Sequence, residues 1–364
     1  EAAAVVQAAM VSGVAQHKVD IEKYKRQLKK RIGKGRVIMS VVTDKAQKNP
    51  KRIAFPEGDT RRILRASNLL VDEGIAKPIL LGNPDAIRRQ AQMLKIGLEG
   101  VEIVDSRRSE KRVPYADKFF EKRCRKGVTR QQALRYMNNR TYFGLMMLEM
   151  GDCDAVLSGV VHDYPDIIRS ALQIIDLCPS CSRVSGLFAM IYKDKVYMFA
   201  DTTVNINPNA EELAEIAISA SNVAKAFDID PRVAMLSFSN FGSAQTKESK
   251  KVAEATAIVK KRVPDLVVEG EMQADTALMP ELVERYFPFS DLKEKATVFI
   301  FPDLNAGNIA YKLLQRLGGF TAVGPILMGF SKPVHALHHT LDVNQIVDIA
   351  SIAVVDAQAL EKQK

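Results

Sequence analysis

Two hydrophobic patterns alternate along the chain from Arg52 onward. Short, continuous apolar runs such as "RIAFP", "DAVLSGV" and "VYMFAD" are separated by longer segments whose apolar residues recur at helical spacing. A continuous apolar run of this kind predicts a strand buried on both faces, and such strands occur mostly in parallel sheets with helices on each side. The pattern therefore predicts an α/β fold with mostly parallel sheets.

Three of the predicted strands end in small polar residues and lead into a predicted helix. The segments are 158–172 ("SGVVHDYPDIIRSAL"), 237–249 ("SFSNFGSAQTKES") and 301–318 ("FPDLNAGNIAYKLLQRLG"). Open α/β sheets bind ligands at the carboxyl ends of their strands, and free N–H groups at a helix start attract anions. The third segment is the most specific, because its helix carries Lys312 and Arg316 one turn apart. We expect an anionic ligand with hydrogen-bonding edges there.

Other motifs bear on nucleotide, redox and metal sites. The sequence has neither GxxxxGK[ST] nor a GxGxxG behind a strand, so nucleoside triphosphate and NAD binding lack their usual motifs. Cys178 and Cys181 have CxxC spacing without a second CxxC or a histidine pair, and we expect two free thiols in a turn. The segment "EGEMQAD", with Glu269, Glu271 and Asp275, fits an acidic metal patch or a hydrogen-bonding turn, and we favour the turn.

Length, charge and cysteine content narrow the class of protein. At 364 residues the chain exceeds the roughly 250–300 residues at which single cores stop growing, so we expect two domains. The net charge of +9 is local, because residues 17–52 hold thirteen Lys or Arg against three Asp or Glu, which is +10 and leaves −1 elsewhere. A nucleic-acid interface would spread its basic residues over a folded face, so we expect no nucleic acid. Four cysteines without a signal peptide, and no apolar run near about 18 residues, favour a soluble cytoplasmic protein with no membrane contact.

The N-terminal segment differs from the rest of the chain. It starts with "EAAAVVQAAMVSGVA" and no initiator methionine, and this alanine-rich stretch is typical of a helix. Asp20 suits the N-cap of a second, strongly basic helix that continues to Ile32. We interpret the chain as a piece of a longer protein. The basic helix is then either a solvated surface helix or a connector to a missing domain.

Three histidines, His335, His338 and His339, precede a long apolar segment that predicts a helix. Their spacing would place them on one helical face as metal ligands, but Thr340 or Asp342 suits the N-cap of the helix that follows. The motif also lacks a fourth zinc ligand. We therefore favour a loop at a helix N-terminus, in which the imidazoles donate hydrogen bonds to a phosphate or stack on a ring.

Several ordered segments carry a family resemblance. "FADTTVNINPNAEELAEIAI", "MLSFSNFGSA", "EGEMQADTAL", "FPDLNAGNIAYKLLQRLGG" and "GPILMGFSKPV" together resemble phosphate acetyltransferase over about residues 50 to 360. The N-terminal "AAMVSGVAQHKVDIEKYKRQL" resembles instead the end of the catalytic domain of a bacterial NADP-dependent malic enzyme. The combination is similar to a hybrid malic enzyme, in which a malic enzyme domain is fused to a phosphate-acetyltransferase-like domain.

The resemblance implies two three-layer α/β domains with an interdomain cleft, as in the isocitrate and isopropylmalate dehydrogenases. Residues 1–36 would be the malic enzyme tail and the basic linker helix, and residues 37–179 plus 326–364 would form domain I. Residues 180–325 would form domain II, through which the chain dimerises. Acetyl-CoA is the implied ligand. The residues expected to bind it are Ser239, Asn240, Gly242, Ser243, Asp303, Asn305, Asn308, Lys312, Arg316, Gly324, Pro325, Gly329, Lys332, His338 and His339.

The resemblance also implies that catalytic positions are replaced. His338 and His339 stand where the family has a serine and an arginine, and Gln345 stands where an aspartate helps to deprotonate the thiol. Arg123 and Arg169 match two arginines of the family and imply an anion subsite. We therefore expect no catalytic residue in this chain and no transacetylase activity.

We interpret the chain as an acetyl-CoA-binding allosteric regulatory domain of a hybrid malic enzyme. Phe241 in place of a family lysine, and Tyr164 in place of a small residue, add to the departures. An active phosphate acetyltransferase with an altered site and a purely structural oligomerisation domain are the alternatives. This interpretation expects no cofactor or metal in the chain itself, and NADP with Mg²⁺ or Mn²⁺ in the missing malic enzyme domain. The expected partners are that domain of the same chain and further copies in a homo-oligomer.

Overall fold

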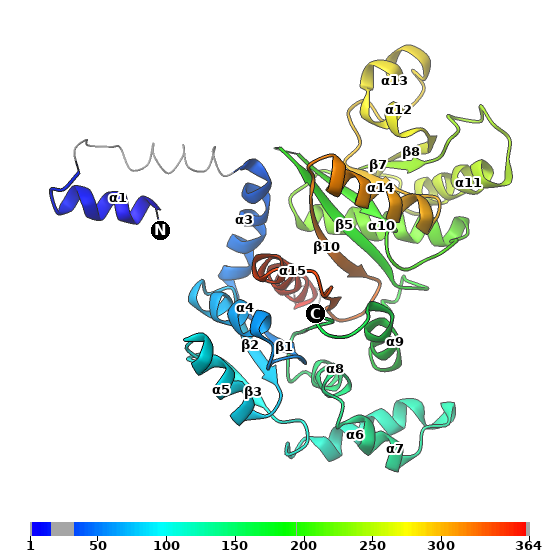
Figure 1. The fold of residues 1–364 in the computed structure, drawn as a ribbon. Coiled ribbons are helices and arrows are strands. Elements are labelled where there is room, and N and C mark those ends of the chain that lie inside the picture. The colour runs from blue at the N-terminus through cyan, green and yellow to red at the C-terminus, as the bar shows by residue number, and fades with distance from the viewer. Residues whose placement is uncertain (1, 16–32, 194, 362–364) are drawn as a thin grey trace.

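The computed structural model describes residues 2–15, 33–193 and 195–361 (Figure 1). The alanine-rich start forms helix α1 (Ala2–Val11), as its composition predicts. The basic helix expected from Asp20 to Ile32 falls outside the described residues. Helix α3 (Gly33–Lys48) then leads into the first strand of the fold.

The first sheet contains five strands in the order β11-β4-β1-β2-β3, and all neighbouring strands are parallel. Ile53 and Phe55 face one hydrophobic core and Ala54 faces the other, so helices cover both sides of the sheet. Helices α3, α4, α5 and α15 lie on the first side, and α6 to α9 lie on the second. The strands are β1 (Lys51–Phe55), β2 (Ala76–Leu81), β3 (Glu102–Val104), β4 (Ala155–Ser158) and β11 (Val334–Ala336). The helices are α4 (Arg61–Asp72), α5 (Pro84–Leu94), α6 (Arg112–Arg123), the short 3₁₀ helix η1 (Cys124–Lys126), α7 (Arg130–Tyr136), α8 (Arg140–Met150), α9 (Tyr164–Ile174) and α15 (Val343–Glu361).

The second sheet contains six strands in the order β10-β5-β6-β9-β7-β8. The pairs β10–β5 and β5–β6 are antiparallel, and the other three pairs are parallel. Helices α10 and α11 cover one face, and α12 and α14 pack against the other (Figure 1). The strands are β5 (Ser185–Tyr192), β6 (Lys195–Ala200), β7 (Arg232–Leu236), β8 (Val267–Met272), β9 (Val298–Ile300) and β10 (Thr321–Met328). The helices are α10 (Ala210–Ala226), α11 (Lys247–Arg262), α12 (Ala274–Leu278), α13 (Pro280–Tyr286) and α14 (Leu304–Leu317).

These two helix-covered sheets confirm the predicted α/β fold class with mostly parallel sheets. The strands of the first sheet come from before Gly159 and after Pro333, and those of the second sheet come from the chain between them. This division supports the expected domain boundaries near 179 and 325, which stay a prediction. Pro325 itself lies inside β10, a strand of the second sheet.

The prediction of free thiols in the CxxC segment is wrong, because Cys178 and Cys181 form a disulfide. Their Cα atoms lie 5.2 Å apart, within the range that a disulfide can bridge. The backbone N–H of Cys178 donates to the carbonyl of Gly329, so the disulfide lies where the chain returns from the second sheet to the first.

Helix α15 is the one helix of the described chain that is long and apolar enough to cross a membrane. Half of its apolar window is buried inside the protein, and Ile346 and Ile349 are fully buried in the core. The apolar segment after the histidines is therefore a core helix of the first domain.

Candidate functional site

The histidine loop and helix α14 lie close together, although one follows the first sheet and the other belongs to the second. The loop holds His338 and His339 directly after β11. The pKa of His338 is lowered by partial burial and, less strongly, by the nearby positive charges of His339 and Lys312. Lys312 is on α14, so the structure brings together two of the segments that the sequence analysis predicted to bind one ligand.

Hydrogen bonds within the loop fix the tautomer of His338. Its Nδ1 lies 2.7 Å from the hydroxyl of Thr340 and also accepts a hydrogen bond from the backbone N–H of Thr340 at 3.3 Å. A backbone N–H can only donate, so Nδ1 carries no proton and the neutral ring has its proton on Nε2. The lowered pKa favours this neutral form near pH 7. His338 therefore presents a hydrogen-bond donor rather than a base.

The end of the loop is a helix cap. Asp342 accepts from the backbone N–H of Gln345 at 2.9 Å, and Gln345 accepts from the backbone N–H of Asp342 at 3.0 Å. This reciprocal pair starts α15, and it confirms Asp342 as the predicted N-cap. Arg62 of α4 donates to the carbonyls of His339 and Leu341 at 2.6 and 2.7 Å, and this contact holds the loop in place. The side-chain oxygen of Gln345 is thus already occupied.

His335 lies apart from the other two histidines. It is 1% exposed, and its Nδ1 accepts from the backbone N–H of Leu327 in β10. Its Nε2 lies 2.9 Å from the carboxylate of Asp356 in α15, without the angle of a hydrogen bond. Among the described residues, no group of three or more His, Cys, Asp or Glu side chains is arranged to hold a metal.

Helix α14 presents two cations, and Asp303 and Asn308 make internal hydrogen bonds at its start. Asp303 caps the helix by accepting from the N–H of Ala306 at 2.9 Å, and Asn308 donates to the carbonyl of Thr202 at 3.1 Å. Lys312 and Arg316 are exposed one turn apart, and neither makes an ion pair with a described residue. Asn305 is also exposed. The helix thus offers two available positive charges beside the histidine loop.

The turn after β7 does not have the free N–H groups that the sequence suggested. The carboxylate of Glu271 accepts from the hydroxyl of Ser239 at 2.9 Å and from the N–H of Gly242 at 2.6 Å. Asn240 exchanges hydrogen bonds with Gln273, and the hydroxyl of Ser243 accepts from the N–H of Asn240. Glu271 therefore acts in a hydrogen-bonding turn, as we favoured from the sequence.

Arg169 lines a cavity of the first domain together with Tyr142, and Arg123 lies near Tyr142. Arg169, His162 and Tyr142 line a cavity of about 240 Å³, in which Arg169 pairs with Asp166 at 2.7 Å. Burial raises the pKa of Tyr142, and the charge of Arg123 lowers it by a smaller amount, so Arg123 is nearby. The Nε of Arg123 is buried and has no hydrogen-bond partner. The two arginines are therefore near the same cavity, and the anion subsite stays a prediction.

Four other expected ligand residues have structural contacts. The ammonium of Lys332 donates to the carbonyls of Leu148 and Glu149 and to the Glu149 carboxylate, which ties it to the end of α8. Gly324 and Pro325 are buried in β10. A Cβ on Gly329 would lie 2.3 Å from the carbonyl oxygen of Arg183.

The sequence analysis missed Glu57 and Arg62. Glu57 follows β1, and the residue is 3% exposed. Its Oε1 accepts hydrogen bonds from the Ser158 hydroxyl and the Gly159 N–H, and its Oε2 has no hydrogen-bond partner among the described residues. Burial raises the pKa of this carboxyl more than the two hydrogen bonds lower it. A glutamate directly behind a buried strand, in "AFPEG", was the available signal.

Comparison with known proteins identifies the family. Residues 37–354 match the family described as phosphate acetyl/butaryl transferase. The chain belongs to this family. The phosphate acetyltransferase of Bacillus subtilis is 42% identical over 320 residues, which cover 88% of this chain and 99% of that one. The enzyme of that name from Nitratidesulfovibrio vulgaris is 44% identical over 316 residues, covering 87% of this chain, and the match spans only 45% of that protein.

Solved structures of the family agree with the fold. A phosphotransacetylase from Streptococcus pyogenes superposes with a TM-score of 0.86 at 39% identity, over 89% of this chain and 99% of that one. The EutD phosphotransacetylase from Staphylococcus aureus superposes with a TM-score of 0.84 at 36% identity, with the same coverage.

These relatives correct the functional interpretation drawn from the sequence. Proteins that match most of this chain at about 40% identity are named phosphate acetyltransferase, so the interpretation as a regulatory domain without transacetylase activity is wrong. The assignment to malic enzyme and to NADP-dependent oxidoreductases is wrong for the same reason. Nothing in these matches supports a malic enzyme domain, NADP or a divalent metal as a partner.

Proposed function

We propose that the chain is a phosphate acetyltransferase, which moves an acetyl group between coenzyme A and phosphate. The observation that carries this proposal is the identity of 42% to a phosphate acetyltransferase along 99% of that enzyme's length. The site supports it through the grouping of His338 and His339 with Lys312, because a bound CoA and phosphate carry several negative charges.

The chain's own residues would act mainly by positioning and by hydrogen bonding. In the direction from acetyl phosphate, the CoA sulfur bonds to the acetyl carbon, the bond from that carbon to the phosphate oxygen breaks, and phosphate leaves. Negative charge develops on the acetyl oxygen, and the Nε2–H of neutral His338 is a donor suited to stabilise it. Lys312 and Arg316 would hold CoA phosphates, and Arg123 and Arg169 the transferred phosphate.

The thiol proton needs a different acceptor from the aspartate of the family. Gln345 cannot take a proton, and its oxygen caps α15. A thiol of ordinary pKa, about 8.5, is ionised to a few per cent at pH 7, so the thiolate can enter from solution. We therefore expect kcat/KM for CoA to rise about tenfold per pH unit between about pH 6 and 7.5, the range in which thiolate is scarce.

A pair of substitutions tests the proposal and the role of His338. Acetyl transfer between acetyl phosphate and CoA is measured for the unmodified chain, for His338→Gln and for His338→Ala. Glutamine keeps an N–H donor near the place of Nε2 but has no acid–base function. We expect His338→Gln to keep activity within about tenfold and His338→Ala to lose about 100- to 1000-fold.

Two outcomes would contradict these statements separately. An unmodified chain that binds CoA by calorimetry but gives no turnover would refute the proposed function. Equal loss in both variants would leave the function standing and would refute the role of the His338 Nε2–H as a donor.

We also propose that the chain forms a dimer through the domain of the second sheet. Ile309, Leu313 and Leu317 form an apolar stripe along α14 and are 56%, 52% and 83% exposed, which is unusual unless a partner covers them. Leu313→Glu should shift the mass measured by light scattering toward the monomer, and Leu172→Glu, also at an exposed apolar position, should not.

We place the protein in the cytoplasm, where CoA is available to it.

A further inference from the structure

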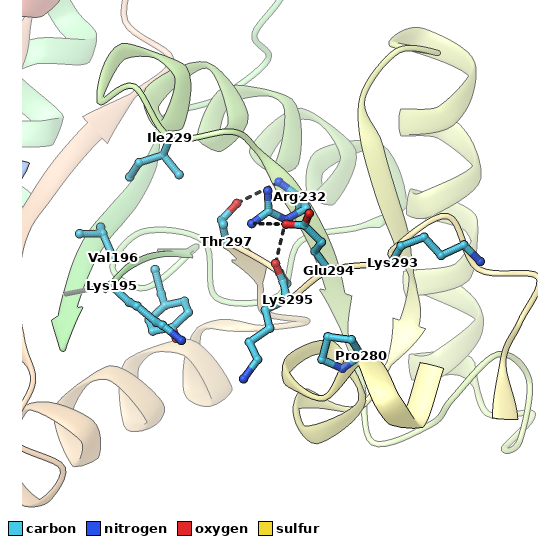
Figure 2. Close-up of a pocket in the computed structure, with 11 residues that line it drawn as sticks. Lys195, Val196, Ile229, Arg232, Pro280, Lys293, Glu294, Lys295 and Thr297 are labelled. Carbon is cyan, nitrogen blue, oxygen red and sulfur yellow. Dashed lines mark hydrogen bonds and ion pairs between the residues drawn. The ribbon is translucent and has the colours of Figure 1, made fainter. Parts of the chain in front are cut away.

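A second cavity lies at one end of the second sheet. It has a volume of about 480 Å³ and opens where strands β6, β7 and β9 begin (Figure 2). These three strands are parallel, so their carboxyl ends, after which helix α14 begins, are at the other edge. The volume lies within the range of about 300–1,000 Å³ that is usual for small-molecule sites.

One wall of the cavity is apolar and another is held rigid by Arg232. The apolar residues are Val196, Ile229, Pro280 and Ala296. The guanidinium of Arg232 donates to the carbonyl of Lys295 at 2.9 Å and to the carboxylate of Asp230 at 2.6 Å, and it pairs with Glu294 at 3.5 Å. Figure 2 shows the contacts of Arg232 with Glu294, Lys295 and Thr297. One guanidinium thus faces two carboxylates, so Arg232 adds no net positive charge, and the positive charge of the cavity comes from its lysines.

Two of the three lysines that line the cavity have no partner among the described residues. Lys293 donates to the carbonyl of Pro288 at 2.9 Å. Lys195 and Lys295 are exposed, and no hydrogen bond or ion pair of their ammonium groups exists within the described chain. In the view of Figure 2 their side chains extend toward the same side of the cavity. A dianion placed between them would receive two charge-assisted contacts.

We propose that this cavity is a second ligand site, which binds a small organic phosphate. The apolar body of the ligand would lie against Val196, Ile229 and Pro280, and its phosphate would lie between Lys195 and Lys295. A phosphate monoester carries close to two negative charges near neutral pH, which matches two ammonium groups that have no partner within the described residues. The site is separate from the proposed reaction site and does not depend on the proposed function.

Phenyl phosphate is a suitable probe, because it combines an apolar ring with a dianion. Its binding is measured by calorimetry with CoA and inorganic phosphate at saturating concentrations, so that the reaction site is filled. We expect one site that Lys195→Gln and Lys295→Gln each weaken by about tenfold, the typical effect of losing one charged contact. Lys261→Gln, on the exposed face of α11, removes the same charge elsewhere and should leave the affinity unchanged.

Several results would overturn the proposal. These are no binding at millimolar phenyl phosphate, equal affinity of all three lysine variants, and binding that is seen only when CoA is left out. Benzyl alcohol, which has the ring without the phosphate, should bind at least about tenfold more weakly. Equal affinity for benzyl alcohol would show a simple apolar pocket and would also refute the phosphate site. Unchanged urea midpoints confirm that each variant is folded.

Discussion

Asp201 provides the sharpest test of how the second sheet supports the site. Its side chain is 2% exposed and accepts five hydrogen bonds in the turn after β6. One carboxylate oxygen accepts from the N–H groups of Gly186, Thr203 and Val204, and the other accepts from the backbone and side chain of Asn205. This turn also positions the carbonyl of Thr202, to which Asn308 of α14 donates.

The substitution Asp201→Asn keeps the size of the side chain but replaces one acceptor by a donor. The amide group would face the two N–H donors of Asn205, so two hydrogen bonds are lost and the remaining three lose their charge. A hydrogen bond to a charged group contributes about 1.5–3 kcal/mol and a neutral one about 0.5–1.5 kcal/mol. The two lost bonds alone correspond to about 3–6 kcal/mol, so we expect a loss of at least about 3 kcal/mol in the free energy of unfolding, a large part of the roughly 5–15 kcal/mol of a typical protein.

Urea unfolding followed by circular dichroism measures this loss. With a slope of about 2–3 kcal/mol per M, the midpoint should fall by at least about 1 M. Asp228→Asn is the matched control, because Asp228 is 62% exposed and, among the described residues, pairs only with Lys45, and asparagine tolerates its φ of 57°. That variant should lose at most about 1 kcal/mol. If both variants shift the midpoint equally, the five contacts of Asp201 do not stabilise the turn.

Two further predictions concern residues near the site. Burial raises the pKa of Glu57 above 4.5, so the stability that this group contributes is present below pH 4.5 and is lost as the pH rises through the folded pKa. Glu57→Gln should therefore have a higher urea midpoint than the unmodified chain at pH 8, with a smaller difference at pH 5. An equal difference at both pH values would contradict this. A Cβ on Gly307 would lie 2.3 Å from the carbonyl oxygen of Asp201, so Gly307→Ala should displace α14 and lower the free energy of unfolding by about 1–3 kcal/mol. The displaced Lys312 should also weaken CoA binding, which calorimetry can measure. The control Asn305→Ala, on the same helix, should leave the free energy of unfolding nearly unchanged.

The features that follow from local chemistry could be predicted from the sequence. Continuous apolar runs such as "RIAFP" and "DAVLSGV" did become buried parallel strands, because burial on both faces leaves no polar position. Asp342 became a helix N-cap because its side chain bonds a backbone N–H only three residues away.

The features that depend on distant residues could not be predicted in this way. The N–H of Gly242 looked free for an anion, but Glu271, which is 29 residues later in the chain, accepts its hydrogen bond. The approach of Lys312 to His338 depends on how the two sheets are placed, which no local pattern encodes. Similarly, the spacing of Cys178 and Cys181 fits free thiols and a disulfide equally well, and the fold decides between them.

The return of the chain to its first sheet has a consequence for protein synthesis. A ribosome would release every strand of the second sheet by the time Met328 emerges, while the first sheet would still lack β11 and the whole of α15. The first domain is then missing the fully buried Ile346 and Ile349 and also the loop that holds His338. The second sheet can therefore fold while the chain is still being made, whereas the first must wait for the last helix. A nascent chain arrested before α15 would hold helix α14, with Lys312 and Arg316, in place without the histidines that lie beside it.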